Sequence, residues 1–589
     1  MTTLRYVFWK FWQLLQTLAR RLYRGFAPVP LSMEEREFCK NNAAFWGELT
    51  GERRVGRRDG YVLAPVGGHP VIKLSDASFS SIVACARSLK LLFLTGEPPG
   101  SAGAQLLASY PEATFVSLNG WQHPWQQVKA CLQAARAYAR LRSPADVLAF
   151  HEDGIKFGDV IYDAVLVGGY ATLDRVDSRV WDVLRRFYFL RGFLIHLLRH
   201  YDIQTSVFAH LIGLQGATLS RYLLSRGIEV FWRVGSHQVL VRRYRGLQDV
   251  GIYPVKPEPG YFRLMLEGDD GTIRRRAEEY LERRFNQRVE HPTVTLAFNA
   301  AKAVYTDRAA FCRAFGLRLD RPIAFVMLHI FNDYPHSHFA KPMLFQDYYW
   351  WFRRTLDLAL KIPHVNWVFK EHPAASYYRT KDVDLHKIFA GLKAEHVCFL
   401  PAGADFNARS IPHLAHAIIT CVGTAGVEYA TCGIPCLLGG ESEYSGLGFT
   451  IEPETPEAYE ECLRHVEKFP RLTPEQVVRA KLAAYFCFCV MESARYHFCP
   501  KFTNVEISEW NASLTARLWK EAAAHFRDPA HVERMRNQVE ELGRFVLDRD
   551  WTQYVDFRQF PFLRQSPVGA GASRAWEPSQ AMGFRRRED

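Results

Sequence analysis

Short apolar runs alternate with longer amphipathic stretches along most of this chain, and the alternation predicts a parallel sheet flanked by helices. In the first half, the apolar runs predict strands at residues 89–95, 112–118, 145–150, 205–210 and 228–232. The amphipathic stretches between them predict helices at residues 126–142, 181–200 and 213–226.

A second series of the same kind follows a charged, mostly helical stretch at residues 270–290. Its predicted strands cover residues 323–329, 366–370, 397–400, 417–422 and 435–438. Two such series predict an α/β fold in which two Rossmann-like domains face each other across a cleft. The predicted divisions are an N-terminal helix at 1–30, domains at 31–290 and 291–472, a helical segment at 473–560 packing on both, and a flexible tail at 561–589.

The first 30 residues carry a basic amphipathic pattern. At 3.6 residues per turn one face is apolar, the opposite face carries Lys and Arg, and no acid precedes Glu34. Such a helix is suited to lie in the interface of an anionic membrane, through residues 5–24. Its apolar runs are too short to span a bilayer. The alternatives are that it packs on the protein core or docks a partner protein.

Length, charge and cysteine content narrow the class of protein. A chain of 589 residues with 48% hydrophobic content is too long for one core and too apolar for a disordered protein. Its 12 cysteines are scattered without a CxxC pair, which favours reduced thiols and a cytosolic location. The net charge of +12 is concentrated near the N-terminus, and no nucleic-acid-binding module is recognised, so we expect no nucleic-acid partner.

One turn has the pattern of an anion site. An apolar run at 417–422 leads into Gly423, Thr424, Ala425 and Gly426, and a short helix that carries Glu428 follows. Backbone N–H groups at a helix start, together with the helix dipole, attract phosphate or carboxylate, and Glu428 lies one turn further on. The alternative is an ordinary βαβ unit whose small residues allow close packing.

A second strand ends in charged and titratable residues. The apolar run at 366–369 is followed by Lys370, Glu371, His372 and Pro373, and proline directs the chain out of the sheet. In parallel sheets these side chains would lie near the Gly423–Gly426 turn. Lys370 and His372 are therefore candidates to stabilise a leaving phosphate.

These two motifs, with the Gly-rich stretch at 439–450, resemble bacterial capsular and surface polysaccharide biosynthesis proteins. Those proteins are GT-B glycosyltransferases related to the Kdo and sialic acid transferases. Three further segments, at 151–154, 328–336 and 405–410, fit the same resemblance, which extends over about residues 140–500. Glu371 departs from the Lys-Pro-His-Pro pattern common in that family.

The resemblance implies a GT-B fold and a nucleotide-sugar donor, and it supports an acidic pair in the acceptor-side domain. Asp153 and Glu152 are the candidate catalytic carboxylates, with His372; the alternative is that Asp153-Gly154 is only a turn. The donor-binding candidates are Lys370, Gly423, Thr424, Ala425, Gly426, Glu428, Asn407 and Ser410. The substrate-contact candidates are His329, Asp333, His336, His210 and Tyr444. We expect no metal and no cofactor other than the nucleotide sugar as co-substrate.

The sequence thus predicts a cytoplasmic glycosyltransferase at the inner face of the cell membrane. It would move a sugar to a surface polysaccharide or lipid-linked acceptor, and the resemblance favours CMP-Kdo or a similar acidic sugar as donor. The alternatives are a UDP- or GDP-sugar transferase on the same fold, a transferase of a polyol phosphate from a donor such as CDP-glycerol, and a non-catalytic scaffold of a polysaccharide assembly and export complex.

Overall fold

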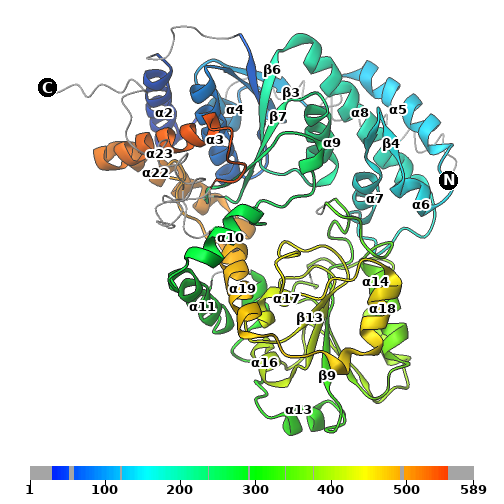
Figure 1. Ribbon diagram of the computed structural model, residues 1–589. Helices are drawn as coiled ribbons and strands as arrows, with labels where there is room; N and C mark the ends of the chain where they lie inside the picture. Colours follow the sequence, from blue (N-terminus) through cyan, green and yellow to red (C-terminus); the bar gives the residue numbers. More distant parts are fainter. Residues whose placement is uncertain are drawn as a thin grey trace.

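The computed structural model describes residues 29–51, 59–119, 123–236, 238–289, 292–337, 340–375, 377–490 and 496–554 (Figure 1). The predicted membrane-surface segment at 5–24 and the predicted tail at 561–589 lie outside these residues. Within the described part of the chain, no helix combines the length and hydrophobicity that crossing a membrane requires.

Six strands in the described N-terminal half form the first sheet, in the order β3-β2-β1-β6-β7-β8. Neighbouring strands run parallel except for the β7–β8 pair. The strands are β1 (Tyr61–Pro65), β2 (Lys90–Thr95), β3 (Ala113–Ser117), β6 (Ile203–Phe208), β7 (Glu229–Val234) and β8 (Leu240–Tyr244). This order reverses direction between β1 and β6, as a Rossmann-like sheet does.

Helices cover both faces of this sheet because its strands alternate apolar side chains to either side. On β2, Leu91 and Phe93 join the apolar cluster of α3, whereas Leu92 and Leu94 join that of α5. The helices are α2 (Met33–Gly51), α3 (Pro70–Arg87), α4 (Ala102–Leu107), α5 (Pro124–Tyr138), α6 (Pro144–Leu148), α7 (Gly158–Leu166), α8 (Ser178–His200) and α9 (Gly213–Leu224).

The second sheet is wholly parallel among the described residues, in the order β11-β10-β9-β12-β13. Its strands are β9 (Ile323–Met327), β10 (Asn366–Lys370), β11 (Val397–Leu400), β12 (Ala417–Thr420) and β13 (Cys436–Leu438). Its order reverses between β9 and β12. The helices of this half are α12 (Pro292–Ala297), α13 (Arg308–Ala314), α14 (Tyr348–Ala359), α15 (Leu385–Ala390), α16 (Ile411–Leu414), α17 (Ala425–Ala430) and α18 (Pro456–Arg464). The predicted α/β architecture with two Rossmann-like domains is confirmed.

Helices from two parts of the chain join the domains. α10 (Pro259–Gly268) and α11 (Thr272–Phe285) lead from the first sheet to the second, and α19 (Pro474–Ala484) returns beside them (Figure 1). A π-helical turn, Tyr485–Cys489, follows α19, and α21 (Asn504–Ser508), α22 (Ala512–Arg527) and α23 (Pro529–Leu547) then pack on the first domain. One continuous apolar cluster includes side chains from both sheets and from these returning helices.

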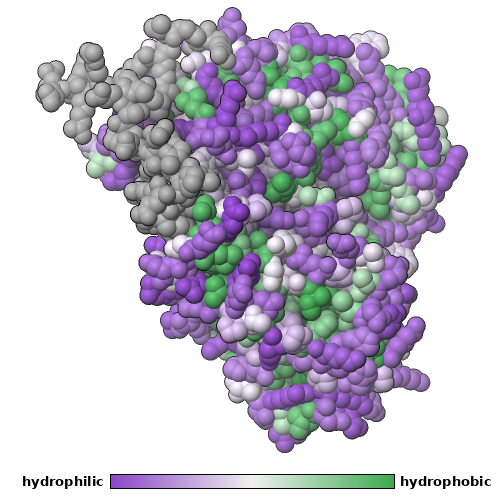
Figure 2. Space-filling model, viewed as in Figure 1, coloured by the Kyte–Doolittle hydropathy of each residue, from purple (hydrophilic) through white to green (hydrophobic). Residues whose placement is uncertain are grey.

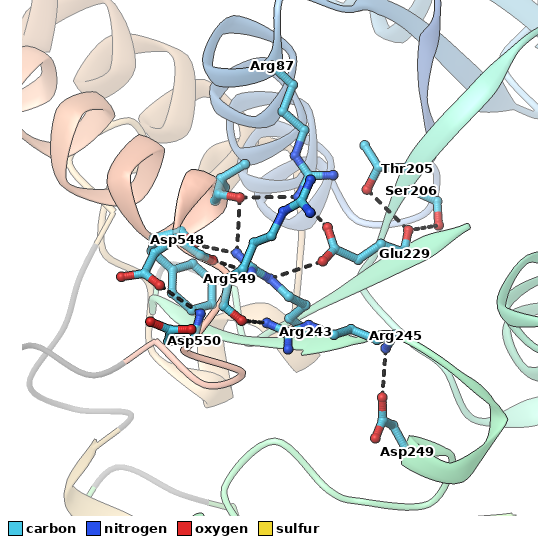
Figure 3. A network of polar contacts seen from close by, with 12 residues as sticks. Arg87, Thr205, Ser206, Glu229, Arg243, Arg245, Asp249, Asp548, Arg549 and Asp550 are labelled. Atoms are coloured by element: carbon cyan, nitrogen blue, oxygen red, sulfur yellow. Dashed lines mark hydrogen bonds and ion pairs between the residues drawn. The ribbon is translucent and has the colours of Figure 1, made fainter. Parts of the chain in front are cut away.

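Two arginines, one of them buried, fasten the end of α23 to the first sheet (Figure 3). Arg243 on β8 is 1% exposed and donates hydrogen bonds to the carbonyls of Phe545 and Val546, and Arg87 donates to the carbonyl of Val546. Both cations also contact the carboxylate of Glu229. Cations at the last turn satisfy carbonyls that a helix end leaves without partners. The C-terminal helices are thus held to the N-terminal domain by charge as well as by packing.

One predicted strand was wrong, and two strands of the first sheet, β1 and β8, were not predicted. Residues 145–150, expected as a strand, form helix α6, because Ser143 and Asp146 cap each other's backbone and Pro144 occupies the first helical turn. The strand β1, at the centre of the first sheet, was missed. The motif at 151–154 then forms a separate two-stranded hairpin, β4 (His151–Glu152) with β5 (Ile155–Lys156).

Candidate active site

A cleft of about 1250 Å³ lies between the two sheets, at the carboxyl ends of their strands. On the N-terminal side it is lined by Gly67, Gly68 and His69 after β1 and by Ala209 and His210 after β6. On the C-terminal side it is lined by Leu328 and His329 after β9 and by residues 422–425 after β12. β1/β6 and β9/β12 are the pairs at which each sheet reverses direction, where ligands bind in open α/β sheets. The two reversal points therefore face one cleft.

Lys370 and His372 enter this cleft from the end of β10, as predicted. Lys370 is 8% exposed and has no carboxylate within ion-pair distance among the described residues. Burial lowers its pKa to about 8, nearby Lys302 acts in the same direction, and Glu428 and Glu371 oppose the shift. Lys370 therefore stays largely protonated at neutral pH, as a buried cation with no partner in close contact.

His372 is held as a neutral imidazole. Burial lowers its pKa to about 4, and the charge of Lys370 adds to the effect. Its Nδ1 accepts a hydrogen bond from the backbone N–H of Ala374, at 3.2 Å. Because a neutral imidazole carries one proton, that bond leaves the proton on Nε2. The ring thus offers the cleft an N–H donor.

In His329 the ring nitrogens have the reverse roles to those in His372, because Nε2 is the acceptor. Its Nε2 accepts from the N–H of Val422 at 3.1 Å and lies 3.1 Å from the Thr420 hydroxyl. The ring stacks on Tyr348 with centroids 4.6 Å apart. Burial, reinforced by His372, lowers its pKa to about 3. His329 lines the cleft as predicted, and its hydrogen bonds tie the end of β9 to the turn after β12.

The turn after β12 offers fewer free amides than the sequence suggested. The N–H of Gly423 donates to the Thr420 hydroxyl, and that of Gly426 donates to the carbonyl of Gly423. Among the described residues, the N–H groups of Thr424 and Ala425 have no hydrogen-bond partner. Thr424 and Ala425 line the cleft, whereas Gly426 does not. Two amides of the predicted four are thus without a partner in residues that line the cleft.

Tyr444 supports this turn from beneath and does not line the cleft. It is 1% exposed, and its hydroxyl donates to the carbonyl of Gly423. A Cβ at Gly426 would overlap the Tyr444 hydroxyl, so this position requires glycine for packing. The expected substrate contact by Tyr444 is corrected to a structural one.

Glu428 lines the cleft and is held by Arg284 of α11. Its Oε1 accepts from Arg284 at 2.7 and 3.1 Å and from the Thr424 hydroxyl at 3.0 Å. Its Oε2 has no hydrogen bond to any described residue. One oxygen fixes the carboxylate, and the other is available to a ligand.

Two further carboxyl groups line the cleft. Burial raises the pKa of Glu443, on the loop after β13, to about 7, and the carboxylate has no hydrogen bond or ion pair within the described chain. Burial also raises the pKa of Asp333 after β9, while the nearby imidazole of His210 opposes the shift. The Nδ1 of His210 donates to the carbonyl of Ile212 at 2.7 Å. Glu443 was not among the predicted site residues.

Glu152 and Asp153 do not line the cleft. Asp153 and Gly154 have φ angles of +51° and +76° and form the two-residue turn of the β4–β5 hairpin. The carboxylates of Asp153 and Glu152 already accept hydrogen bonds from other side chains. Asp153 accepts from Arg191 at 2.8 and 2.9 Å and from Tyr222 at 2.8 Å, and Glu152 accepts from Tyr188 at 2.7 Å. The expected acidic pair at the cleft is corrected to a hairpin turn.

Three other predicted residues also lie away from the cleft lining. Asn407 donates to the carbonyl of Asn299 at 2.8 Å, and the hydroxyl of Ser410 accepts from the N–H of Tyr305 at 2.9 Å, so both fasten the 299–305 segment. The backbone N–H of His336 donates to the buried carboxylate of Asp163 in the other domain, at 3.1 Å. Their predicted contacts to nucleotide or substrate are replaced by structural ones.

The cleft residues that sequence reasoning missed include His69 and Arg284 besides Glu443. His69 follows a Gly-Gly pair directly after β1, and this strand-turn-helix signal at 61–70 was available. Its Nδ1 accepts from the N–H of Val71 at 3.3 Å, and burial lowers its pKa. Arg284 reaches the cleft from α11 and lies 144 residues before Glu428 in the sequence. Nothing in the local pattern around Arg284 indicated this contact. No group of three or more His, Cys, Asp or Glu side chains in the described chain is arranged to hold a metal ion.

No protein-family model matches the sequence, and no curated protein matches it. Similar solved structures include the beta Kdo 2,4 transferase KpsC of Thermosulfurimonas dismutans, at 15% identity, with 48% of this chain and 80% of that chain covered and a TM-score of 0.31. The wall teichoic acid polymerase TagF is 10% identical over 88% of this chain and 99% of that chain, with a TM-score of 0.21. The UDP-GlcNAc 2-epimerase of Neisseria meningitidis is 11% identical over 72% and 97%, with a TM-score of 0.21. At such values these likenesses carry no argument about function.

Proposed function

We propose that this protein is a glycosyltransferase that transfers a sugar from a nucleotide-sugar donor bound in the cleft. The observation that carries the proposal is the pair Lys370 and His372, a buried cation and an N–H donor, placed in the cleft that both sheet-reversal points line. Departure of a nucleotide from a sugar develops negative charge on a phosphate oxygen. Donors fixed in place before the reaction lower the energy of that charge most effectively.

The donor phosphate is proposed to lie between β10 and the turn after β12. Lys370 supplies the positive charge, His372 supplies its Nε2–H, and the amides of Thr424 and Ala425 supply two more donors. Phosphate would raise the pKa of His372 by favouring its charged form.

Glu428 is proposed to bind the ribose of the nucleotide. Ribose presents hydroxyl donors, and the free Oε2 of Glu428 is an acceptor in the same cleft as the phosphate donors. The ion pair with Arg284 keeps the carboxylate in one orientation. An Asp or Glu beside the nucleotide phosphate is a common ribose ligand in Rossmann-like folds.

Glu443 is proposed as the general base that takes a proton from the acceptor hydroxyl. A general base works best when its pKa lies near the working pH, and burial raises that of Glu443 to about 7. Asp333 and His210 lie near each other in the same cleft and would contact the acceptor sugar. Glu443 takes the role that the sequence had given to Asp153 and Glu152.

Two exposed cations of the cleft lining would suit an acidic sugar such as Kdo. Beyond the phosphate donors, Arg288 and Lys501 line the same space. They offer cations to a carboxylate on the transferred sugar or on the acceptor. We therefore propose CMP-Kdo or a similar acidic donor, a glycan or glycolipid acceptor of surface polysaccharide, and action at the cytoplasmic face of the membrane, where residues 5–24 would bind.

The test is a thermal-shift and turnover screen with CMP, UDP, GDP and CDP and their sugar conjugates. It uses the wild-type chain, His372→Ala, and His386→Ala as a matched control on the exposed surface of α15. A ligand at about 100 times its Kd stabilises the native state by about 2.7 kcal/mol. We expect one nucleotide class to stabilise the wild type and the control, and His372→Ala to lose the effect.

Two outcomes would overturn the proposal. If no nucleotide raises the melting temperature of the folded wild type, the protein would be a scaffold component rather than a transferase. If CDP-glycerol is consumed with release of CMP and transfer of glycerol phosphate, the cleft would serve polyol phosphate transfer instead. Sugar transfer with release of the whole nucleotide supports the proposal.

A further inference from the structure

Helix α5 presents an apolar stripe to solvent. Trp125, Val128 and Leu132 are 75%, 51% and 59% exposed, although large apolar side chains at helical spacing usually face a core. The buried side of the same helix consists of Ala130, Ala134 and Ala137 and packs toward α8. Figure 2 shows apolar surface among hydrophilic atoms at the upper right, where Figure 1 places α5. The stripe therefore does not take part in packing the core.

A row of cations runs beside this stripe. Lys129, Arg136 and Arg140 are exposed, and none of them has an ion-pair partner among the described residues. At 3.6 residues per turn, the three apolar and three basic positions share about 120° of the helix surface. Residues 124–142 contain no Asp or Glu. The face thus combines exposed apolar side chains with unneutralised positive charge.

We propose that this face of α5 docks on an anionic lipid bilayer, with Trp125, Val128 and Leu132 entering the interface and the cations contacting lipid phosphates. An amphipathic helix that lies in a membrane interface has this combination of features. Each Lys or Arg near an anionic surface adds to the attraction. The positive charge of the face complements the negative charge of the bilayer.

A second copy of the chain fits this face less well. Two-fold packing of α5 on itself would bring Lys129, Arg136 and Arg140 close to their own copies, and like charges repel. The helix offers no acid to offset that repulsion. An anionic bilayer neutralises the same charges.

The inference is independent of the transferase chemistry, because binding to vesicles is measured without turnover. It also concerns residues other than 5–24. If both segments bind lipid, the N-terminal domain is anchored at two points. A lipid-linked acceptor would then meet the domain that carries His69 and His210.

The experiment is co-sedimentation of the full chain with vesicles of phosphatidylcholine alone or with about one third phosphatidylglycerol. One variant replaces the stripe (Trp125→Ser, Val128→Ser, Leu132→Ser), and another replaces the cations (Lys129→Glu, Arg136→Glu, Arg140→Glu). Matched controls replace exposed residues of the other domain: Val304→Ser, Leu319→Ser and Trp350→Ser, or Lys361→Glu, Lys387→Glu and Lys393→Glu. A third variant, Arg20→Glu, Arg21→Glu and Arg24→Glu, reports on the N-terminal segment alone.

We expect wild type to bind the anionic vesicles, and both α5 variants to partition at least tenfold less while the controls bind as wild type does. Unchanged melting temperatures would show that the α5 variants remain folded. We expect this result because the replaced side chains are exposed. The inference is overturned if the α5 variants bind as tightly as wild type and only the N-terminal variant loses binding. It is also overturned if wild type ignores anionic vesicles, because the face would then serve another partner.

Discussion

Replacing Glu443 by Gln should stabilise the protein at alkaline pH and abolish its proposed activity. The carboxyl group has no hydrogen bond or ion pair to the described residues, and burial raises its pKa from 4.5 to about 7. The folded state therefore holds the proton more tightly than the unfolded state does. By linkage, the ionised carboxylate costs stability as pH rises from about 4.5 to about 7, and the full cost remains above pH 7.

The size of the effect follows from the pKa difference. The difference between a pKa of about 7 in the folded state and 4.5 in the unfolded state corresponds to about 3.4 kcal/mol when Glu443 is fully ionised. At pH 8 nearly all of this penalty applies, whereas at pH 5 only about 1 kcal/mol does. Because Gln carries no charge at either pH, Glu443→Gln should gain about 2.5 kcal/mol more at pH 8 than at pH 5.

The assay is thermal unfolding of wild type and variant at both pH values, with Glu395→Gln as an exposed control in the same domain. For a cooperative unit of 150–250 residues, 1 kcal/mol moves the melting temperature by about 2–4 °C. The variant's advantage should thus grow by about 5–10 °C between pH 5 and pH 8, while the control shows no such growth. An equal shift at both pH values, or a loss at pH 8, would refute the reasoning and show that a cation in the cleft holds Glu443 ionised.

Three further predictions concern the donor subsite and the corrected acidic pair. Arg284→Met leaves the buried carboxylate of Glu428 without its cation and should lower the free energy of unfolding by about 3–5 kcal/mol. Loss of an exposed ion pair costs less than about 1 kcal/mol. A cost that small for Arg284→Met would show that solvent reaches this pair. Gly426→Ala should abolish nucleotide-induced stabilisation, because the added Cβ would overlap the Tyr444 hydroxyl. Adding Tyr444→Phe to the same chain should restore part of the stabilisation. Normal nucleotide binding by Gly426→Ala alone would contradict the close packing. Asp153→Asn should keep sugar-transfer turnover within about twofold of wild type, since the carboxylate lies outside the cleft, whereas a loss of about 100-fold would reinstate it as catalytic.

The strands of the second domain were predictable from sequence because they are short apolar runs, most of them buried. Residues 366–370 and 397–400 match β10 and β11 residue for residue, since continuous apolar runs mark such strands. Residues 145–150 are apolar too, but Ser143 and Asp146 form a capping box that the apolar pattern alone ignores. The strand β1 is an apolar run as long as β10, but the proline at its end is typical of an edge strand, whereas β1 lies at the centre of its sheet.

Contacts between distant segments were beyond a local pattern. Arg284 meets Glu428 only because α11 and α19 pack together beside α17, and Lys501 reaches the cleft only because the C-terminal helices return to the first domain. The predicted motifs at 370–373 and 423–428 did converge, because both follow strands of one parallel sheet that are separated only by β9. Convergence within a sheet is predictable from strand order, whereas convergence of helices on a cleft is not.

The hydrogen bonds separate predicted site residues that can act from those that cannot. In His372, one ring nitrogen is anchored and the other keeps a proton for a ligand. In Glu428, one oxygen is anchored and the other is free. A group anchored at one atom and open at the other is oriented before the ligand arrives, which is what stabilising a transition state requires.

Glu152 and Asp153 show the contrasting arrangement. Both oxygens of Asp153 accept from Arg191, and one of them also accepts from Tyr222; Glu152 accepts from Tyr188, with its other oxygen 3.6 Å from Arg191. A substrate proton would have to compete with these partners for every oxygen. Sequence alone cannot distinguish the two arrangements, because an acid at the end of a strand looks the same whether its oxygens are free or engaged. The distinction depends on Arg191 and Tyr222, which lie on other helices and meet the hairpin only in the folded chain.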